Sequence, residues 1–228
     1  MKFICKDHTP PDLTAYAQTS GASYQDLYDN HRGVWEITRL SLAHEQGYIC
    51  CYCGRRISGL RGTQIEHIWP KGDSRFESMQ LDYQNNLIAS CDGGKYERKL
   101  NPSIPYSDTH CDTPKDNNPI PVHPLMPNCE KKFAYDDQGN VWGLGSDAEV
   151  TIKILNLTST LLKNKRKAAI DNYSILPPSD WQKEYERLDT KDSNGYYPEF
   201  CFVLRSYIWT PLKIHLFREK GFSISFTT

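Results

Sequence analysis

The sequence lacks any long hydrophobic run, which excludes one class of protein. No segment approaches the ~18 consecutive apolar residues that a membrane-spanning helix needs. The first seven residues, MKFICKD, contain too short an apolar run to act as a secretory signal. We therefore expect a protein that works in the cytoplasm and has no membrane partner.

The chain also lacks a surplus of basic residues. Its 27 Lys and Arg face 28 Asp and Glu, which gives a formal net charge of −1 at pH 7. A nucleic-acid partner would therefore have to be held by local patches of positive charge. With 38% hydrophobic residues, the 228-residue chain can form one sizeable domain, or a small core with helical extensions.

A disulfide framework is not expected, although the chain has eight cysteines. Cysteines of a cytoplasmic protein more often serve as metal ligands or reactive thiols. Cys50 and Cys53 have the C-x-x-C spacing that brings two sulfurs to one zinc ion, and Gly54 suits the tight turn. Cys51 could replace Cys50, and redox activity is the main alternative for an isolated C-x-x-C pair.

A four-ligand zinc site needs two further residues. Cys91 and Cys111 are the best candidates, although their separation is far wider than that of a zinc knuckle. Such a site would be closed and structural, because it would hold segments that have little core of their own. Three other residues could replace one of this second pair: His110, His123 and Cys129.

Residues 1–22 contain two adjacent prolines and few apolar anchors, and they predict an irregular arm. The apolar spacing from Ser23 onward predicts two helices that break near Gly33, the second ending at Gly47. Residues 92–121 are rich in Gly, Pro, Asn, Asp and Ser, and they predict a long loop tied down at Cys91 and Cys111.

The second half of the chain predicts a small hairpin followed by helices. Residues 133–142 alternate around a polar turn, as in a β-hairpin. Ser146 with Glu149 resembles a capping box, and Thr158 could cap a further helix. One side of that helix is basic, which indicates either a solvated face or a face that contacts phosphates. The basic residues are Lys163, Lys165, Arg166 and Lys167. Further predictions are a short helix at 181–188, a buried segment at 200–208 and a strand at 222–226.

Glu66 and His67 lie in a stretch, 65–68, with the pattern of a half-buried strand that Pro70 ends. On a regular strand the two side chains would point to opposite faces, unless the backbone bends. An acid beside a histidine is common by chance. The fixed order makes this pair notable, because the thiol pair precedes it while Asn86 and a further cysteine follow it.

In this order the residues resemble the zinc-stapled HNH endonucleases. The similarity is closer still to HNH nucleases of the PtuB type, from the Septu and retron-associated anti-phage defence systems. It rests on the C-x-x-C pair, residues 65–71, Asn86-Leu87 and residues 110–115. The motifs cover about residues 48–117, and a more diffuse likeness extends over most of the chain.

The resemblance implies an α+β fold: a zinc-stapled ββα-metal (HNH) core with flanking helices and a small β-hairpin. It implies an N-terminal arm and helices over 1–47 and an HNH nuclease core with the zinc site over 48–120. A hairpin and a helical C-terminal part over 121–228 would pack on this core.

The resemblance also implies roles for single residues. His67 would be the general base that deprotonates a water molecule for attack on phosphorus. Glu66 and Asp112 would bind the catalytic Mg²⁺ or Mn²⁺ ion, and Asn86 would hold the loop that orients His67. The structural Zn²⁺ would be held by Cys50, Cys53, Cys91 and Cys111.

Four basic residues would contact substrate phosphates: Lys71, Lys115, Arg55 and Arg56. Asp112 departs from the family pattern, which has His or Asn at this position. The neighbouring His110 is the alternative metal ligand.

The activity implied is hydrolysis of phosphodiester bonds in DNA or tRNA, leaving a 5′-phosphate. The implied partners are a PtuA-like ATPase and, in some systems, a retron reverse transcriptase with its RNA–DNA hybrid. A non-catalytic zinc module that binds nucleic acid or a partner protein is the alternative. Such a module would need the thiols but not Glu66, His67 or Asp112.

Overall fold

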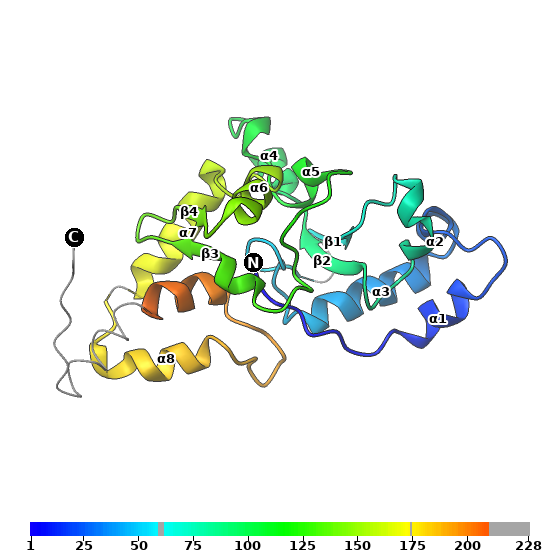
Figure 1. The fold of residues 1–228 in the computed structure, drawn as a ribbon. Coiled ribbons are helices and arrows are strands. Elements are labelled where there is room, and N and C mark those ends of the chain that lie inside the picture. The colour runs from blue at the N-terminus through cyan, green and yellow to red at the C-terminus, as the bar shows by residue number, and fades with distance from the viewer. Residues whose placement is uncertain (59–61, 174, 210–228) are drawn as a thin grey trace.

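The structure, a computed structural model, describes residues 1–58, 62–173 and 175–209. Helices alternate with two small antiparallel sheets, so the chain has a mixed α+β fold (Figure 1). No helix within the described residues is long and apolar enough to cross a membrane.

Three helices form the N-terminal part: α1 (Pro11–Ala17), α2 (Tyr24–Asn30) and α3 (Arg32–Glu45). The prediction of an irregular arm is wrong over α1. Pro11 can begin a helix because its missing N–H has no partner to lose there, and Leu13 and Tyr16 anchor the helix in the core. The two helices predicted after Ser23 are confirmed, but the break falls at His31.

The central sheet consists of β1 (Thr63–His67) and β2 (Leu87–Cys91), paired antiparallel with His67 opposite Leu87. α3 packs against both strands, and every residue of β2 is buried. The buried Gln46, just after α3, joins helix and sheet. Its side-chain amide donates to Ala89 O and its carbonyl accepts from Ala89 N–H, both at 2.7 Å.

The prediction that residues 92–121 form one long loop is wrong. They contain α4 (Lys95–Leu100), a 3₁₀ turn (Tyr106–Asp108) and α5 (Asp112–Lys115). Further 3₁₀ turns lie at Ser74–Met79, Cys129–Lys132 and Pro178–Asp180.

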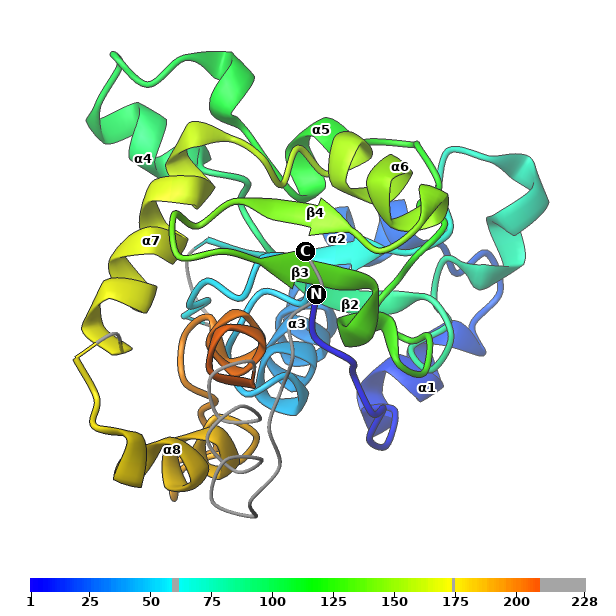
Figure 2. The same ribbon diagram turned by 60° about the vertical axis from the view of Figure 1, so that its left-hand side comes forward.

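The C-terminal part holds the predicted hairpin, β3 (Phe133–Tyr135) and β4 (Val141–Gly143), which is confirmed. It is followed by α6 (Ser146–Ile154), α7 (Thr160–Tyr173), α8 (Trp181–Arg187) and a helix over 201–209. Figure 2 shows the hairpin between α6 and the 201–209 helix. The predicted strand at 222–226 lies outside the described residues.

Both predicted helix caps are wrong. Ser146 is already the first residue of α6, and the Glu149 carboxylate accepts from Gly143 N–H instead of closing a capping box. At α7 the hydroxyl that accepts from Leu162 N–H belongs to Ser159, not Thr158.

Two clusters of buried hydrophobic residues hold the molecule together. The larger one runs from Met1 to Leu162 and includes the sheet, α3 and the hairpin. The smaller one lies under the 201–209 helix and includes Ile49, Ile170 and Val203. Because Ile49 immediately precedes the first thiol, the C-terminal helix packs directly beside the cysteine-bearing turn.

Candidate metal and catalytic site

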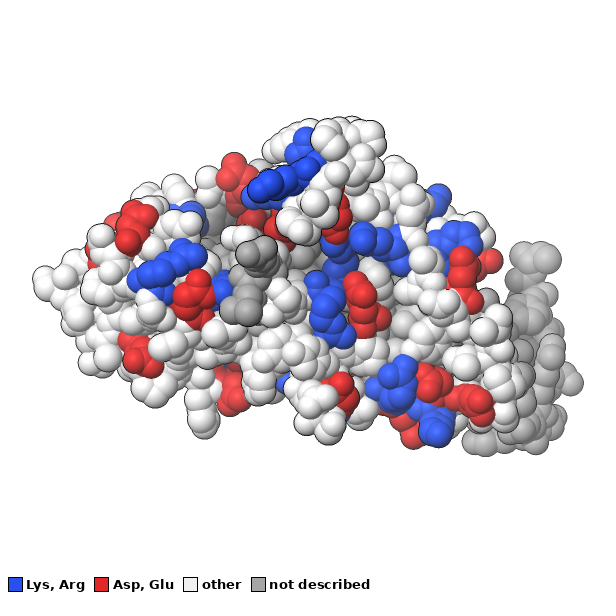
Figure 3. Space-filling model, turned by 180° about the vertical axis from the view of Figure 1, so that it is seen from behind, with Lys and Arg blue, Asp and Glu red and all other residues white. Residues whose placement is uncertain are grey.

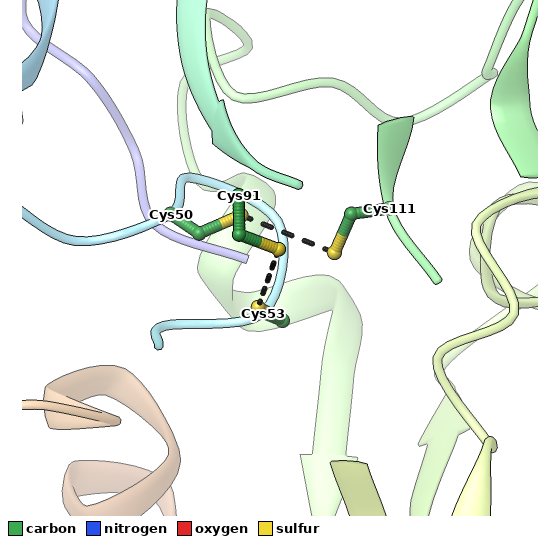
Figure 4. A group of neighbouring side chains, drawn as sticks. All are labelled: Cys50, Cys53, Cys91 and Cys111. Carbon is green, nitrogen blue, oxygen red and sulfur yellow. Dashed lines mark hydrogen bonds between the residues drawn. The ribbon is translucent and has the colours of Figure 1, made fainter. Parts of the chain in front are cut away.

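Four buried cysteines from three parts of the chain meet in one cluster (Figure 4). Cys50 and Cys53 come from the turn after α3, Cys91 ends β2, and Cys111 directly precedes α5. Their sulfur atoms all lie within 4.8 Å of one another. The Cys50–Cys111 and Cys53–Cys91 sulfur distances are 3.9 and 3.8 Å.

The predicted tight turn at the first thiol pair is present. The Cys50 N–H donates to Arg55 O at 2.8 Å, and Gly54 N–H donates back to Cys50 O at 2.9 Å. Gly54 has φ +82°, and a Cβ here would lie 2.9 Å from the Phe202 ring. Glycine is therefore required both by the backbone conformation and by the approach of the C-terminal helix.

The cluster fits a structural zinc ion, because zinc takes four thiolates in a closed tetrahedral site. Cys50 and Cys53 are 0% and 3% exposed, whereas a redox-active thiol needs access to its reaction partner. Within the described residues this is the only set of three or more Cys, His, Asp or Glu side chains close enough to share an ion. The alternatives considered for it lie outside: Cys51, His110, His123 and Cys129.

A second feature is a cavity of about 230 Å³ between β1 and α5. Glu66, His67 and Asp112 line it together with Lys71 and six further residues: Ile65, Pro70, Lys95, Thr113, Asp116 and Asn117. Glu66 and His67 both line this cavity, although they are consecutive residues at the end of β1. The regular alternation expected for a strand does not separate them.

The Glu66 carboxylate is buried and surrounded by specific partners. Its Oε1 accepts from Lys115 Nζ at 2.8 Å and from the Tyr52 hydroxyl at 3.3 Å. Burial, opposed by the charge of Lys115 and reinforced by Asp112, raises the pKa of Glu66 to about 8. The buried Glu66 carboxyl thus faces the half-buried Asp112 carboxyl, with Lys115 beside the first and Lys95 4.0 Å from the second. A divalent ion would stabilise two carboxyl groups placed in this way.

The His67 imidazole is held in one orientation. Its Nε2 lies 3.0 Å from Gln80 O, so the N–H is on Nε2 and the Nδ1 atom is free to accept a proton. The Tyr24 ring packs edge-on against it, with centroids 4.4 Å apart. Burial, aided by the charges of Lys71 and Lys115, lowers the pKa of His67 to about 4, so the ring is neutral at physiological pH.

Asn86 is fully buried and pins the segment between Trp69 and Met79. Its Oδ1 accepts from Trp69 N–H at 2.7 Å, and its Nδ2 donates to Met79 O at 2.9 Å. This segment leads into Gln80, the residue that holds His67. Asn86 thus lies at the position that would orient the imidazole through the intervening loop.

The predicted basic residues have different surroundings. Lys71 lines the cavity and lies over the Tyr24 ring, 4.9 Å from its centroid. Lys115 is 1% exposed, and its Nζ donates to His67 O at 2.8 Å as well as to Glu66. Arg55 pairs with Glu97. None of these contacts tests phosphate binding, which stays a prediction.

Two other basic side chains have structural partners. Arg56 donates to three backbone carbonyls, those of Gly47, Tyr48 and Tyr197. The prediction that Arg166 lies on a solvated or phosphate-contacting basic face is wrong. It is 2% exposed and donates to Gly139 O and Leu157 O, because α7 packs over the hairpin turn.

The sequence did not indicate several residues of the cavity. Lys95 and Asn117 come from the glycine- and proline-rich region and carry no motif of their own. Tyr52 had one signal, its place inside the thiol turn, which brings its hydroxyl to Glu66.

Comparison with known proteins gives one distant relative and no matching family model. The chain is 27% identical over 212 residues to a protein of Vibrio cholerae serotype O1 biovar El Tor whose name reads "Retron Vc95 putative HNH endonuclease". The match covers 89% of this chain and 97% of the relative. The similarity therefore extends over the N-terminal helices and the C-terminal part as well as the central motifs.

Proposed function

We propose that this protein is a metal-dependent HNH endonuclease of the PtuB type, the effector subunit of an anti-phage defence complex. The observation that carries the proposal is that Glu66, His67 and Asp112 line one cavity. The four-cysteine cluster is joined to the same elements, because Cys91 ends β2 and Cys111 directly precedes α5. The similarity to the Vibrio cholerae protein over nearly the whole chain supports the same assignment.

The two metal sites have different donors. The four thiols would hold a structural Zn²⁺, and residues 48–120 would form the nuclease core as a ββα-metal unit built from β1, β2 and α5. Glu66 and Asp112 would hold Mg²⁺ or Mn²⁺, hard ions that bind through one or two carboxylates and keep other positions for water and phosphate. An ion held by these carboxylates would supply Lewis-acid polarisation of the phosphate and charge stabilisation at the leaving oxygen.

His67 acts as the general base in this proposal. Gln80 O keeps the N–H on Nε2, and Nδ1 takes a proton from a water molecule. The water oxygen forms a bond to phosphorus while the bond from phosphorus to the 3′ oxygen breaks, which leaves a 5′-phosphate. Lys71, on the cavity wall, meets the charge of the substrate phosphate.

The substrate is DNA or tRNA, and substrate capture involves partners. A net charge of −1 gives the chain little long-range attraction for nucleic acid. A PtuA-like ATPase, and in retron systems the reverse transcriptase with its RNA–DNA hybrid, would supply that attraction.

The test is cleavage by the purified complex carrying His67→Ala. We expect cutting of DNA and tRNA panels in Mg²⁺ or Mn²⁺ to be abolished, with zinc content and thermal unfolding retained. His67→Gln, which keeps more of the side-chain volume, controls for the lost packing against Tyr24. If Glu66, His67 and Asp112 can all be replaced without loss of defence in cells, the protein is instead a non-catalytic zinc module.

A further inference from the structure

The segment between the third and fourth cysteines projects from the molecule beside the cavity. Residues 92–110, here called the finger, contain α4 and the turn Tyr106–Asp108, and they form the top of the molecule in Figure 1. Both ends are fixed, because Cys91 and Cys111 belong to the same buried thiol cluster. The Asn156 amide also holds the returning limb by donating to Ser107 O and Thr109 O, both at 2.7 Å.

The acidic side chains of the finger are engaged within the protein. Asp92 accepts from the N–H groups of Gly94 and Tyr96 at the start of α4. Glu97 pairs with Arg55, and Lys165 lies 3.7 Å from the same carboxylate. The third acid of the finger behaves likewise, since Asp108 accepts from Thr160 N–H at 3.0 Å.

The lysines and tyrosines of the finger face outward, whereas Arg98 is half-buried and its Nε donates to Ile104 O at 3.3 Å. α4 buries no residue, and Lys95 and Lys99 are exposed. Tyr96 and Tyr106 are 54% and 66% exposed. Arg98 lies over the Tyr106 ring, 5.0 Å from its centroid. In the view from behind, a band of Lys and Arg atoms lies on one side of the projection at the top of the molecule, most of which is neither basic nor acidic (Figure 3).

The finger is continuous with the proposed catalytic cavity. Lys95 lines that cavity, and its Nζ lies 4.0 Å from the Asp112 carboxylate. A strand whose phosphate reaches Glu66 and His67 would therefore pass along α4 as it leaves the cavity. The outward surface it would meet is positive, although the whole chain is not.

We propose that the finger binds a single-stranded stretch of the substrate next to the cut phosphate. Lys95, Arg98 and Lys99 would contact its phosphates, while Tyr96 and Tyr106 would stack on unpaired bases. Exposed tyrosines interleaved with cations suit single strands, because only unpaired bases offer their faces for stacking. This inference rests on the proposed nuclease function and adds to it the form of the substrate.

The experiment compares binding of a fluorescent single-stranded oligonucleotide with binding of the matching duplex, by anisotropy at low salt with the full chain. DNA and RNA versions are both used. We expect Tyr96→Ala and Tyr106→Ala each to weaken single-strand binding by about fivefold or more, as loss of one stacked base predicts. Duplex binding should change little, and Tyr→Phe variants should retain affinity. Lys99→Ala should reduce the salt dependence.

Trp142→Ala, at an exposed aromatic residue on β4, and Lys183→Ala, at an exposed lysine on α8, are the matched controls. Photocrosslinking of an iodouridine-containing strand should map to Tyr96 or Tyr106. The proposal is overturned if wild-type protein binds no single strand, if the tyrosine variants bind as wild type, or if crosslinks map elsewhere. If the complex carrying the tyrosine variants cuts normally, the proposed role of the finger is refuted and the proposed nuclease function stands. If the chain binds single strands through the finger but its complex never cuts, only the proposed nuclease function is refuted.

Discussion

Asn86 shows how one buried amide can organise the segment next to the proposed catalytic histidine. Its side chain serves both ends of the segment from Trp69 to Met79, and no atom of it is exposed. The next residue after this segment, Gln80, fixes the tautomer of His67. The orientation of His67, the proposed general base, therefore depends on Gln80 and on the Asn86 hydrogen bonds that hold the segment before Gln80.

Asn86→Ala should reduce cleavage and lower the free energy of unfolding. The variant leaves Trp69 N–H without its partner, at about 1–3 kcal/mol for a group left unpaired. Met79 O loses one of its two donors and keeps the Asp82 N–H at 3.1 Å. Chemical denaturation and cleavage by the complex measure the two effects. Asn85→Ala is the matched control, because Asn85 is exposed and should cost less than about 0.5 kcal/mol. Equal effects of the two variants would contradict this role of Asn86.

Lys115 is the second residue whose surroundings decide its role. Its ammonium group is buried between Glu66 and His67 O, so it balances the paired carboxyl groups of the cavity. Lys115→Met should destabilise the fold by about 3–5 kcal/mol above about pH 8, where Glu66 is ionised and would be left as a buried charge without its partner. Adding Glu66→Gln should recover part of this loss in denaturation curves. A double variant as unstable as the single one would argue against the ion pair as the cause.

At the level of elements, the thiol turn joins the central sheet to the C-terminal helix. Gly54 allows both the tight turn and the contact with Phe202. Gly54→Ala should lower the free energy of unfolding by about 1–3 kcal/mol through backbone strain and overpacking. Gly21→Ala is the control, because Gly21 also has positive φ (+78°) but no atom lies within 4 Å of an added Cβ. If the two variants cost the same, the contact with Phe202 contributes nothing.

The four-cysteine cluster should hold the finger and α5 in place. Cys91→Ser should lose bound zinc, lower the melting temperature and increase proteolysis within residues 92–110, because metal binding of this kind is part of the folding energy. Cys129→Ser is the matched control, since Cys129 is buried but lies outside the cluster. Metal analysis, thermal unfolding and limited proteolysis give the three measurements. A Cys91→Ser variant with full zinc content would contradict the assignment of this ligand.

At the scale of the whole molecule, the weak net charge limits what the chain can do alone. Counterion release gives non-specific nucleic-acid binding most of its affinity, and it needs many phosphate contacts. We expect the isolated chain to cleave poorly at physiological salt and the complex with the proposed PtuA-like ATPase to cleave well. Parallel assays with and without the partner measure this. Robust cleavage by the chain alone would remove the need for a partner.

Local sequence patterns were sufficient to predict a structural element where its signal lay within a few neighbouring residues. The hairpin at 133–142, the helices after Ser23 and the glycine turn after Cys53 were all predicted from short stretches. Both helix caps were wrong, for different reasons. At α6 the cap position is occupied by Gly145, which has no side chain to accept a hydrogen bond. At α7 the hydroxyl of Ser159 accepts from Leu162 N–H in place of Thr158. Helix α1 was missed because a proline pair indicates a helix start as well as a loop.

The sequence by itself determined the set of chemical groups and their order: the thiol pair, Glu66-His67, Asn86, and Cys111-Asp112. Only the tertiary structure decided which cysteines meet, since Cys91 and Cys111 are joined across the finger by packing and not by spacing. It also decided that Lys115 and Arg166 are buried. The reason is physical: contacts between distant segments depend on how strands and helices pack. Local sequence fixes which groups are available, but not which of them become neighbours.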